Sequence, residues 1–150
     1  MEIERKFLID VLPDHLESYP HHRIEQAYLN TDPVIRIRRQ DNDYIFTYKG
    51  RGMLSREEVN LPMCQADYDH LLTLATGTVI TKCRYVIPLE NGLSVELDLF
   101  EGTWSGLILA EVEFPTEEMA HSFMPPSWFA REVTYDEHYH NSWLSQHCPE

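Results

Sequence analysis

The chain has 150 residues, of which 25 are acidic and 12 are basic, so its formal net charge at pH 7 is −13. This acidic excess argues against a nucleic-acid or anionic-membrane partner, because such partners attract proteins with an excess of positive charge. Hydrophobic residues make up 43% of the chain and charged residues 25%, as in ordinary globular proteins. A chain of this length is expected to form one domain, residues 1–150, with a sizeable core.

The cysteine content and the absence of long apolar segments indicate the compartment. Cys64, Cys83 and Cys148 are odd in number and match no zinc-binding spacing, which predicts free thiols in a reducing environment. No basic segment followed by an apolar run opens the chain, and no stretch approaches membrane-spanning length. We therefore expect a cytoplasmic protein without a membrane partner.

The first residues of the chain carry charges in alternation. Read as a strand, they place Glu2, Glu4 and Lys6 on one face, with about 6–7 Å from one side chain to the next. Two carboxylates at this spacing repel each other unless a cation lies between them. A divalent metal ion on Glu2 and Glu4, with Lys6 reaching an anion beyond it, would relieve the repulsion. An exposed edge strand with no ligand is the alternative.

Further strands dominate the rest of the pattern. Runs with two-residue alternation are separated by polar or glycine-containing turns such as Asp41-Asn42-Asp43 and Asn91-Gly92, as is typical of antiparallel strands. Together with the first strand, which continues into residues 7–9, the pattern predicts eight strands. The other seven are expected over residues 23–30, 34–39, 44–49, 53–61, 79–87, 93–100 and 107–114.

Three helices are expected between and after these strands. Residues 65–75 carry apolar side chains at helical spacing, and Gly77 is expected to end this helix. Thr116 is expected to cap a short second helix. A last helix is expected over residues 135–146, where Thr134 begins a capping box.

These elements predict an α+β protein built on a closed eight-stranded antiparallel β-barrel, with helices packed on its outside. Five of the strands carry an aliphatic face opposite an ionic face, and the two longer helices need an aliphatic surface to cover. We therefore expect the aliphatic faces to point outward and the charged faces to line a tunnel. The charged residues expected to line it are Glu2, Glu4, Lys6, Arg36, Arg38, Lys49, Arg56, Glu58, Lys82, Arg84, Glu96, Asp98, Glu111 and Glu113.

A charged interior limits what the tunnel can hold. Each buried ion loses several kcal/mol of solvation, so such an interior is reasonable only if it is wet and holds a ligand that matches both signs of charge. The basic residues require a polyanion and the acidic residues require divalent cations, and a metal-bound polyphosphate satisfies both. The alternative is an ordinary sheet with these charges in solvent. Against it, seven of the 12 basic residues fall on strand positions that fit a single face.

The ordered motifs resemble those of a known family, the triphosphate tunnel metalloenzymes or CYTH superfamily. Glu2-Ile3-Glu4-Arg5-Lys6 has the ExExK form of that family, and the length and ending of the chain are similar to the short bacterial members that hydrolyse inorganic triphosphate. The resemblance covers nearly the whole chain. Its other motifs are Gln26-Ala27-Tyr28-Leu29, Ile35-Arg36-Ile37-Arg38, Thr47-Tyr48-Lys49-Gly50, Arg56-Glu57-Glu58, Thr81-Lys82-Cys83-Arg84-Tyr85, Glu96-Leu97-Asp98 and Glu111-Val112-Glu113-Phe114.

The resemblance implies an eight-stranded tunnel enzyme that depends on Mg²⁺ or Mn²⁺ and acts on a triphosphate or nucleotide-like polyphosphate. Tyr28 and Lys82 are expected to position the attacking water. Glu58, Glu96 and Asp98 are expected to place that water or a second metal ion. The metal-binding residues are expected to be Glu2, Glu4, Glu96, Asp98, Glu111 and Glu113. The substrate-binding residues are expected to be Lys6, Arg36, Arg38, Lys49, Arg56, Lys82 and Arg84.

Two positions depart from the family pattern. Asn60 stands where many members have a second acidic residue, which would weaken a second metal site, and His140 stands where a lysine is usual. Alternative functions are hydrolysis of thiamine triphosphate, reaction of a nucleoside triphosphate, including cyclisation of ATP, or binding of polyphosphate without turnover. Tyr28 could also be a simple wall residue. A homodimer is compatible with these expectations.

Overall fold

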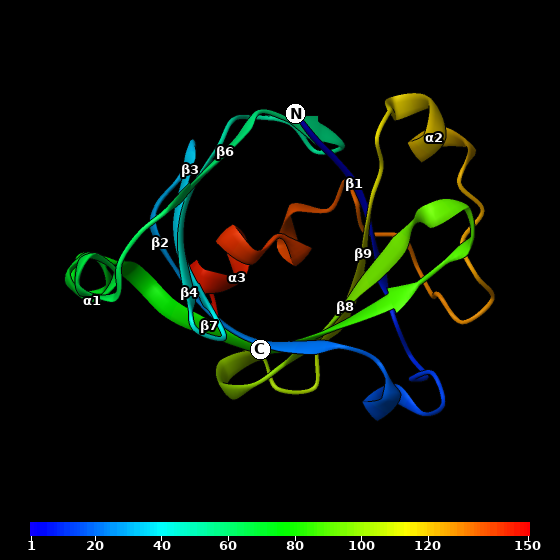
Figure 1. Cartoon of the computed structure of the whole chain (residues 1–150), viewed down its shortest axis with the longest axis horizontal. Coiled ribbons are helices and arrows are strands. Elements are labelled where there is room, and N and C mark those ends of the chain that lie inside the picture. The colour runs from blue at the N-terminus through cyan, green and yellow to red at the C-terminus, as the bar shows by residue number, and fades with distance from the viewer.

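The computed structural model describes residues 1–150 as one antiparallel sheet that curls into a barrel (Figure 1). The sheet has nine strands in the order β5-β1-β9-β8-β7-β2-β3-β4-β6. The expected barrel of mixed α+β class is confirmed, with one strand more than the eight expected. The strands are β1 (Glu2–Leu8), β2 (His21–Thr31), β3 (Val34–Gln40), β4 (Asp43–Lys49), β5 (Ser55–Arg56), β6 (Glu58–Pro62), β7 (Thr76–Pro88), β8 (Ser94–Phe100) and β9 (Ile108–Glu113).

The additional strand arises because the single strand expected over residues 53–61 is two strands that break at Glu57. β5 pairs with β1, where Arg56 lies opposite Glu2, whereas β6 pairs with β4, where Glu58 lies opposite Lys49. The chain therefore leaves one ladder and joins the next within three residues. This corner connects the two edges of the sheet, so the barrel is nearly closed.

Two helices cover the outside of the barrel. α1 (Gln65–Leu72) packs against β3 and β4, and its buried Tyr68 contacts Ala27 and Ile37. It ends before the predicted Ala75, and Gly77 does not end it but lies in β7. α2 (Glu117–Ser122) is capped as predicted, because the Thr116 side chain accepts a hydrogen bond from the Met119 amide at 3.1 Å.

The helix predicted over residues 135–146 is divided. A short 3₁₀ turn, Glu137–Tyr139, and α3, Asn141–Gln146, are separated by the extended residue His140. The predicted capping box is wrong: Asp136 caps the 3₁₀ turn, whereas the Thr134 hydroxyl accepts a hydrogen bond from the Lys6 amide of β1 at 2.9 Å. Tertiary pairing with β1 has replaced the local cap.

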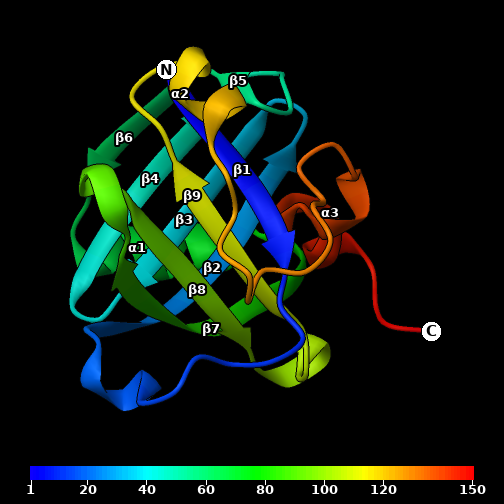
Figure 2. The same cartoon turned by 90° about the vertical axis from the view of Figure 1, so that its right-hand side faces the viewer.

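α3 lies at one end of the barrel (Figure 2) and is seen through the ring of strands in Figure 1. A hydrogen bond from Trp104 Nε1 to the Leu144 carbonyl, at 2.9 Å, holds α3 in this position. Gly77 allows this close approach, because a Cβ atom there would lie 2.2 Å from the Ser145 carbonyl oxygen. Unlike α1 and α2, α3 therefore closes the barrel end and presents Asn141 and Ser142 to its interior.

The barrel has its aliphatic core outside and its charges inside. On β8, Val95 and Leu97 are fully buried in the largest hydrophobic cluster, beneath α2 and residues 119–129, whereas Glu96 points to the interior. The same alternation along β1 and β9 follows from the two-residue period of strands. The predicted inversion of an ordinary barrel is thus present. No helix of the structure combines the length and the apolar character that crossing a membrane would require.

Replacing Leu97 by alanine tests the outer core. Because Leu97 has 0% exposure, we expect Leu97→Ala to lower the free energy of unfolding by about 2–5 kcal/mol, measured by urea denaturation. Leu61, which is 54% exposed on β6, is the matched control, and Leu61→Ala should change the free energy of unfolding by less than about 0.5 kcal/mol. Equal effects of the two substitutions would contradict the assignment of the core.

Candidate functional site

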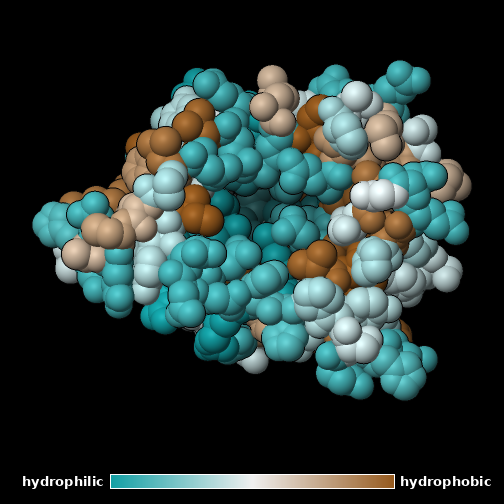
Figure 3. Space-filling model, in the orientation of Figure 1, coloured by the Kyte–Doolittle hydropathy of each residue, from teal (hydrophilic) through white to brown (hydrophobic).

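A hydrophilic cavity of about 290 Å³ runs into the barrel, and its mouth is the hollow at the centre of Figure 3. Thirteen of the fourteen charged residues predicted to line a tunnel line this cavity, and Tyr28 does so as well. The exception is Asp98. Val34 and Ile45 are the aliphatic residues of the lining, so the cavity offers mainly charged and hydrogen-bonding groups to a ligand.

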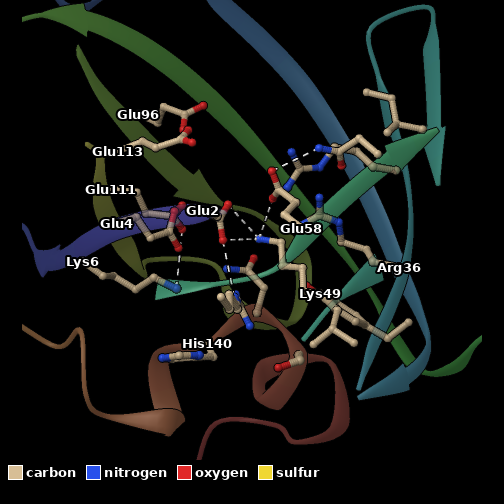
Figure 4. Close-up of a pocket in the computed structure, with 18 of the residues that line it drawn as sticks. Glu2, Glu4, Lys6, Arg36, Lys49, Glu58, Glu96, Glu111, Glu113 and His140 are labelled. Carbon is tan, nitrogen blue, oxygen red and sulfur yellow. Dashed lines mark hydrogen bonds and ion pairs between the residues drawn. The ribbon is translucent and has the colours of Figure 1, made fainter. Parts of the chain in front are cut away.

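One wall of the cavity is acidic and is formed by β1, β8 and β9. The strand register pairs Glu4 with Glu113 and Glu96 with Glu111. In the cavity the side chain of Glu111 lies beside that of Glu4, and the side chain of Glu113 beside that of Glu96 (Figure 4). Burial, together with the negative charges of Glu111 and Glu2, raises the pKa of Glu4 to about 8. Without a cation this carboxyl group is therefore mainly protonated at neutral pH. Closely spaced carboxylate oxygens of this kind favour the binding of a divalent metal ion.

The opposite wall is basic and contains two arginines that no carboxylate neutralises. Arg36 of β3 donates from Nη2 to the Thr47 hydroxyl at 3.2 Å, and its Nε is the only buried side-chain nitrogen or oxygen without a hydrogen-bond partner. Arg38 bonds only to the neutral side chain of Gln26. Burial, with Arg36 and Arg84 nearby, lowers the pKa of Arg38 to about 9, so it stays mainly charged at neutral pH. Arg36 is buried and Arg38 is half-buried, and cations in such positions without a counter-ion indicate an anionic ligand.

Elsewhere the two walls neutralise each other across the cavity. Lys49 Nζ lies 3.0 Å from Glu2 Oε1 and 3.4 Å from Glu58 Oε2, and Arg56 Nε lies 3.4 Å from Glu2 Oε1 (Figure 4). Burial, the largest single effect, would raise the pKa of Glu2, but the Lys49 ammonium group together with Glu58 and Arg56 outweighs it, and the pKa falls to about 2. A metal ion on Glu2 would therefore compete with Lys49, and an anion on Lys49 would compete with Glu2.

Asp98 lies behind the wall rather than in it. It is fully buried, with one oxygen 2.8 Å from Lys82 Nζ and the other 2.8 Å from Arg84 Nε. Although burial opposes ionisation, Arg84 and Lys82 lower the pKa of Asp98. Both of its oxygens contact cations, so Asp98 holds Lys82 and Arg84 in place in this structure, and its role as a metal ligand stays a prediction.

The inner end of the cavity is formed by residues of the C-terminal segment. His140 donates a hydrogen bond from Nε2 to the Thr134 carbonyl at 3.2 Å, and burial with the nearby Lys6 charge lowers its pKa to about 4. It is therefore a neutral group at pH 7. Asn141 and Ser142 were not predicted as lining residues, because the sequence predicts an outer helix over residues 135–146 and no local signal marks the break at His140.

The donor chemistry of the acidic wall fits a divalent metal ion, although no three carboxylate, imidazole or thiolate groups already converge as a binding set. Lys49 holds Glu2, and Lys6 Nζ lies 3.5 Å from Glu111 Oε1. The carboxylates are thus engaged by lysines of the chain. Release of these lysines to an anionic ligand would free the carboxylates for a metal ion.

Comparisons with known proteins agree on one family. The CYTH domain profile matches residues 1–142. The chain is 40% identical to an inorganic triphosphatase of Nitrosomonas europaea over 99% of both chains. It is 33% identical to an inorganic triphosphatase of Acetivibrio thermocellus over 94% of this chain and 90% of the relative.

Solved structures show the same architecture. A crystal structure of an inorganic triphosphatase superimposes with a TM-score of 0.73 and 36% identity, covering 100% of this chain and 97% of the other. A Hippeastrum protein described as a putative adenylyl cyclase with a dominant triphosphatase activity gives a TM-score of 0.63 at 18% identity, covering 81% of this chain and 83% of the other. The second likeness supports the fold alone.

The pairing of Lys49 with Glu2 predicts that metal and polyphosphate bind cooperatively. Each ligand removes one partner of the pair and so frees the other partner for the second ligand. We expect Mg²⁺ and a non-hydrolysable triphosphate analogue together to raise the melting temperature by more than the sum of their separate effects, with a coupling free energy of about 1–3 kcal/mol. Differential scanning fluorimetry at matched free ligand concentrations measures this.

The variant Lys49→Met provides the control for that experiment. It removes the competing ammonium group, so the metal ion alone should stabilise this variant more than it stabilises the wild type, and the coupling should shrink. Strictly additive effects of the two ligands on the wild-type protein would show that the Lys49–Glu2 pair does not link the two binding events.

Proposed function

The chain belongs to the CYTH family, and from this membership and the geometry of its tunnel we propose that it is an enzyme that hydrolyses inorganic triphosphate with the help of a divalent metal ion. The observation that carries the proposal is the pair of opposed walls. Arg36 and Arg38 have no counter-ion in the chain, while Glu4 and Glu111 crowd together on the other side. A metal-complexed chain of phosphates satisfies both walls at once.

The basic wall binds the substrate. Arg36 and Arg38 lie on β3, Lys49 lies at the end of β4, and Lys82 and Arg84 lie on the neighbouring side of the barrel on β7. At an effective dielectric constant near 20, one cation–phosphate contact at 4 Å contributes about 4 kcal/mol, so several contacts can offset the repulsion among the cations themselves. Lys6 and Arg56 complete the set from β1 and β5.

The acidic wall would hold the metal ion through Glu2, Glu4, Glu111 and Glu113, and Mg²⁺ or Mn²⁺ suits such an all-oxygen set. When bound, the ion supplies neutralisation of the negative charge that develops on the phosphate oxygens during transfer. Glu58 and Glu96 also line the tunnel and are the candidates for a second site. Asn60 Nδ2 donates a hydrogen bond to Glu58 Oε1 at 3.1 Å and adds no negative charge. A second metal ion would therefore bind more weakly there than beside two carboxylates.

Hydrolysis requires a water molecule in line with a terminal phosphorus. The water oxygen bonds to that phosphorus, the bridging P–O bond breaks, and phosphate and diphosphate leave with the water proton passing to a nearby acceptor. Tyr28 accepts a hydrogen bond from Gln26 Nε2 at 3.2 Å, so its own hydroxyl proton is free to orient a group in the tunnel. Lys82 lies close to Tyr28, to which it is linked through Asn141 and Gln26. Glu58 also lines the tunnel and is our candidate to accept a hydrogen bond from the water.

Substitution of Glu4 and Lys6 tests the proposed site. Each side chain supplies a charged contact to the metal ion or the substrate, so Glu4→Gln and Lys6→Ala should each lower the rate of phosphate release from tripolyphosphate by about a thousandfold. Glu118→Gln, an exposed carboxylate of α2, is the control and should leave the rate unchanged. Circular dichroism should show that all three variants are folded. Wild-type metal-dependent activity in either tunnel variant would rule out the assignment.

Substrate choice is tested by phosphate release from tripolyphosphate, ATP and thiamine triphosphate side by side, with Mg²⁺ and then with Mn²⁺. The tunnel lining consists mainly of charged and hydrogen-bonding groups, and Tyr28, Val34 and Ile45 alone offer apolar surface to a base or a thiazolium ring. We therefore expect the highest kcat/KM for tripolyphosphate. A higher value for ATP or thiamine triphosphate would favour another member of the same family, and binding without turnover of any of the three would favour a polyphosphate-binding protein.

A further inference from the structure

Two buried amide side chains, Gln26 of β2 and Asn141 of α3, lie among the cations of the tunnel. Gln26 Oε1 accepts from Arg38 Nε at 2.9 Å and from Arg38 Nη2 at 2.7 Å. Gln26 Nε2 donates to Asn141 Oδ1 at 3.1 Å, and the same oxygen accepts from Lys82 Nζ at 3.0 Å. A continuous chain of hydrogen bonds thus joins Arg38 to Lys82 through two neutral groups.

The orientation of both amides is fixed by the chemistry of their neighbours. Arginine and lysine only donate hydrogen bonds, so the oxygen of Gln26 must face Arg38 and the oxygen of Asn141 must face Lys82. The nitrogen of Gln26 is then free to reach both Asn141 and the hydroxyl of Tyr28.

The amide of Asn141 fixes the direction of the Lys82 ammonium group. Of its three N–H groups, one reaches Asp98 Oδ2 at 2.8 Å and one reaches Asn141 Oδ1. The aromatic ring of Phe100 lies 5.3 Å from Nζ. One N–H group therefore remains for a ligand, and its direction is determined by the other two contacts.

Neutral groups at these positions preserve the positive charge of the wall. Asp98 is shared between Lys82 and Arg84, and Arg38 has no carboxylate partner. A carboxylate in place of either amide would accept the same hydrogen bonds from the cations but would cancel charge that the phosphates need. Amide groups accept the same hydrogen bonds and leave the positive charge of the wall unchanged.

We propose that Gln26 and Asn141 are positioning residues, which hold Arg38, Tyr28 and Lys82 in the arrangement that binds and orients the triphosphate while leaving the wall positively charged. The inference rests on the proposed function, since it concerns the same tunnel. It also gives α3 a role in the reaction, because the helix end that closes the barrel carries the amide on which Lys82 depends.

Two variants of Asn141 separate positioning from charge. Asn141→Ala removes the acceptor for Lys82, so we expect kcat for tripolyphosphate to fall by about tenfold to a hundredfold while KM changes by less than about threefold. Asn141→Asp keeps an acceptor for Lys82 and Gln26 but adds a negative charge. We expect it to keep the wild-type melting temperature and to weaken tripolyphosphate binding by about tenfold or more, measured by isothermal titration calorimetry without metal.

Gln146→Ala is the matched control on the same helix. The Gln146 side chain bonds to Thr76 and lies outside the tunnel lining, so this variant should keep the kinetic constants of the wild type. Wild-type kcat in Asn141→Ala, or wild-type affinity in Asn141→Asp, would overturn the inference even if the protein hydrolyses triphosphate. A wild-type protein that neither binds nor hydrolyses tripolyphosphate would overturn the proposed function as well.

Discussion

Compensation of charge across the barrel interior is the constraint on which the rest of the structure depends. Carboxylates from β1, β8 and β9 pair directly with cations from β4 and β7, as for Glu2 and Lys49 at 3.0 Å and for Asp98 and Arg84 at 2.8 Å. Without these pairs a buried interior of this composition would cost several kcal/mol for each ion. Compensation is incomplete at Arg36, Arg38 and Glu4, and these are the positions where a polyphosphate and its metal ion would complete it.

An interior of charges requires that the hydrophobic core lie outside the sheet. The cluster around Phe7, Leu97 and Val112 is therefore covered by α2 and the segment that follows it. Arg5, on the outward face of β1, fastens this cover: it bonds to Glu132 at 2.7 and 2.8 Å and to the Ala120 carbonyl at 2.8 Å. β1 thus carries tunnel residues on one face and the anchor of the outer cover on the other, which explains why alternation in this strand is so regular.

The period of two along the strands made most of the tunnel lining predictable, because each strand has only two faces and one of them is aliphatic. The features that could not be predicted depend on contacts between distant segments. The break at Glu57 follows from pairing with two different strands, and the division of the last helix at His140 accompanies the hydrogen bond between Thr134 and β1. Asp98 has the position in the alternation of β8 that was expected to face the tunnel, but Lys82 and Arg84 contact both of its oxygens and it does not line the cavity. No sequence pattern shows this.

The most direct test of the central claim is a crystal structure of the protein with Mn²⁺ and a non-hydrolysable triphosphate analogue, in which anomalous scattering locates the metal ion. We expect a manganese peak between Glu4 and Glu111 and the phosphate chain along Arg36, Arg38 and Lys49, with Lys49 released from Glu2. Manganese and phosphate bound on the outer surface of the barrel, with the Lys49–Glu2 pair intact inside it, would show that the two walls do not form the binding site.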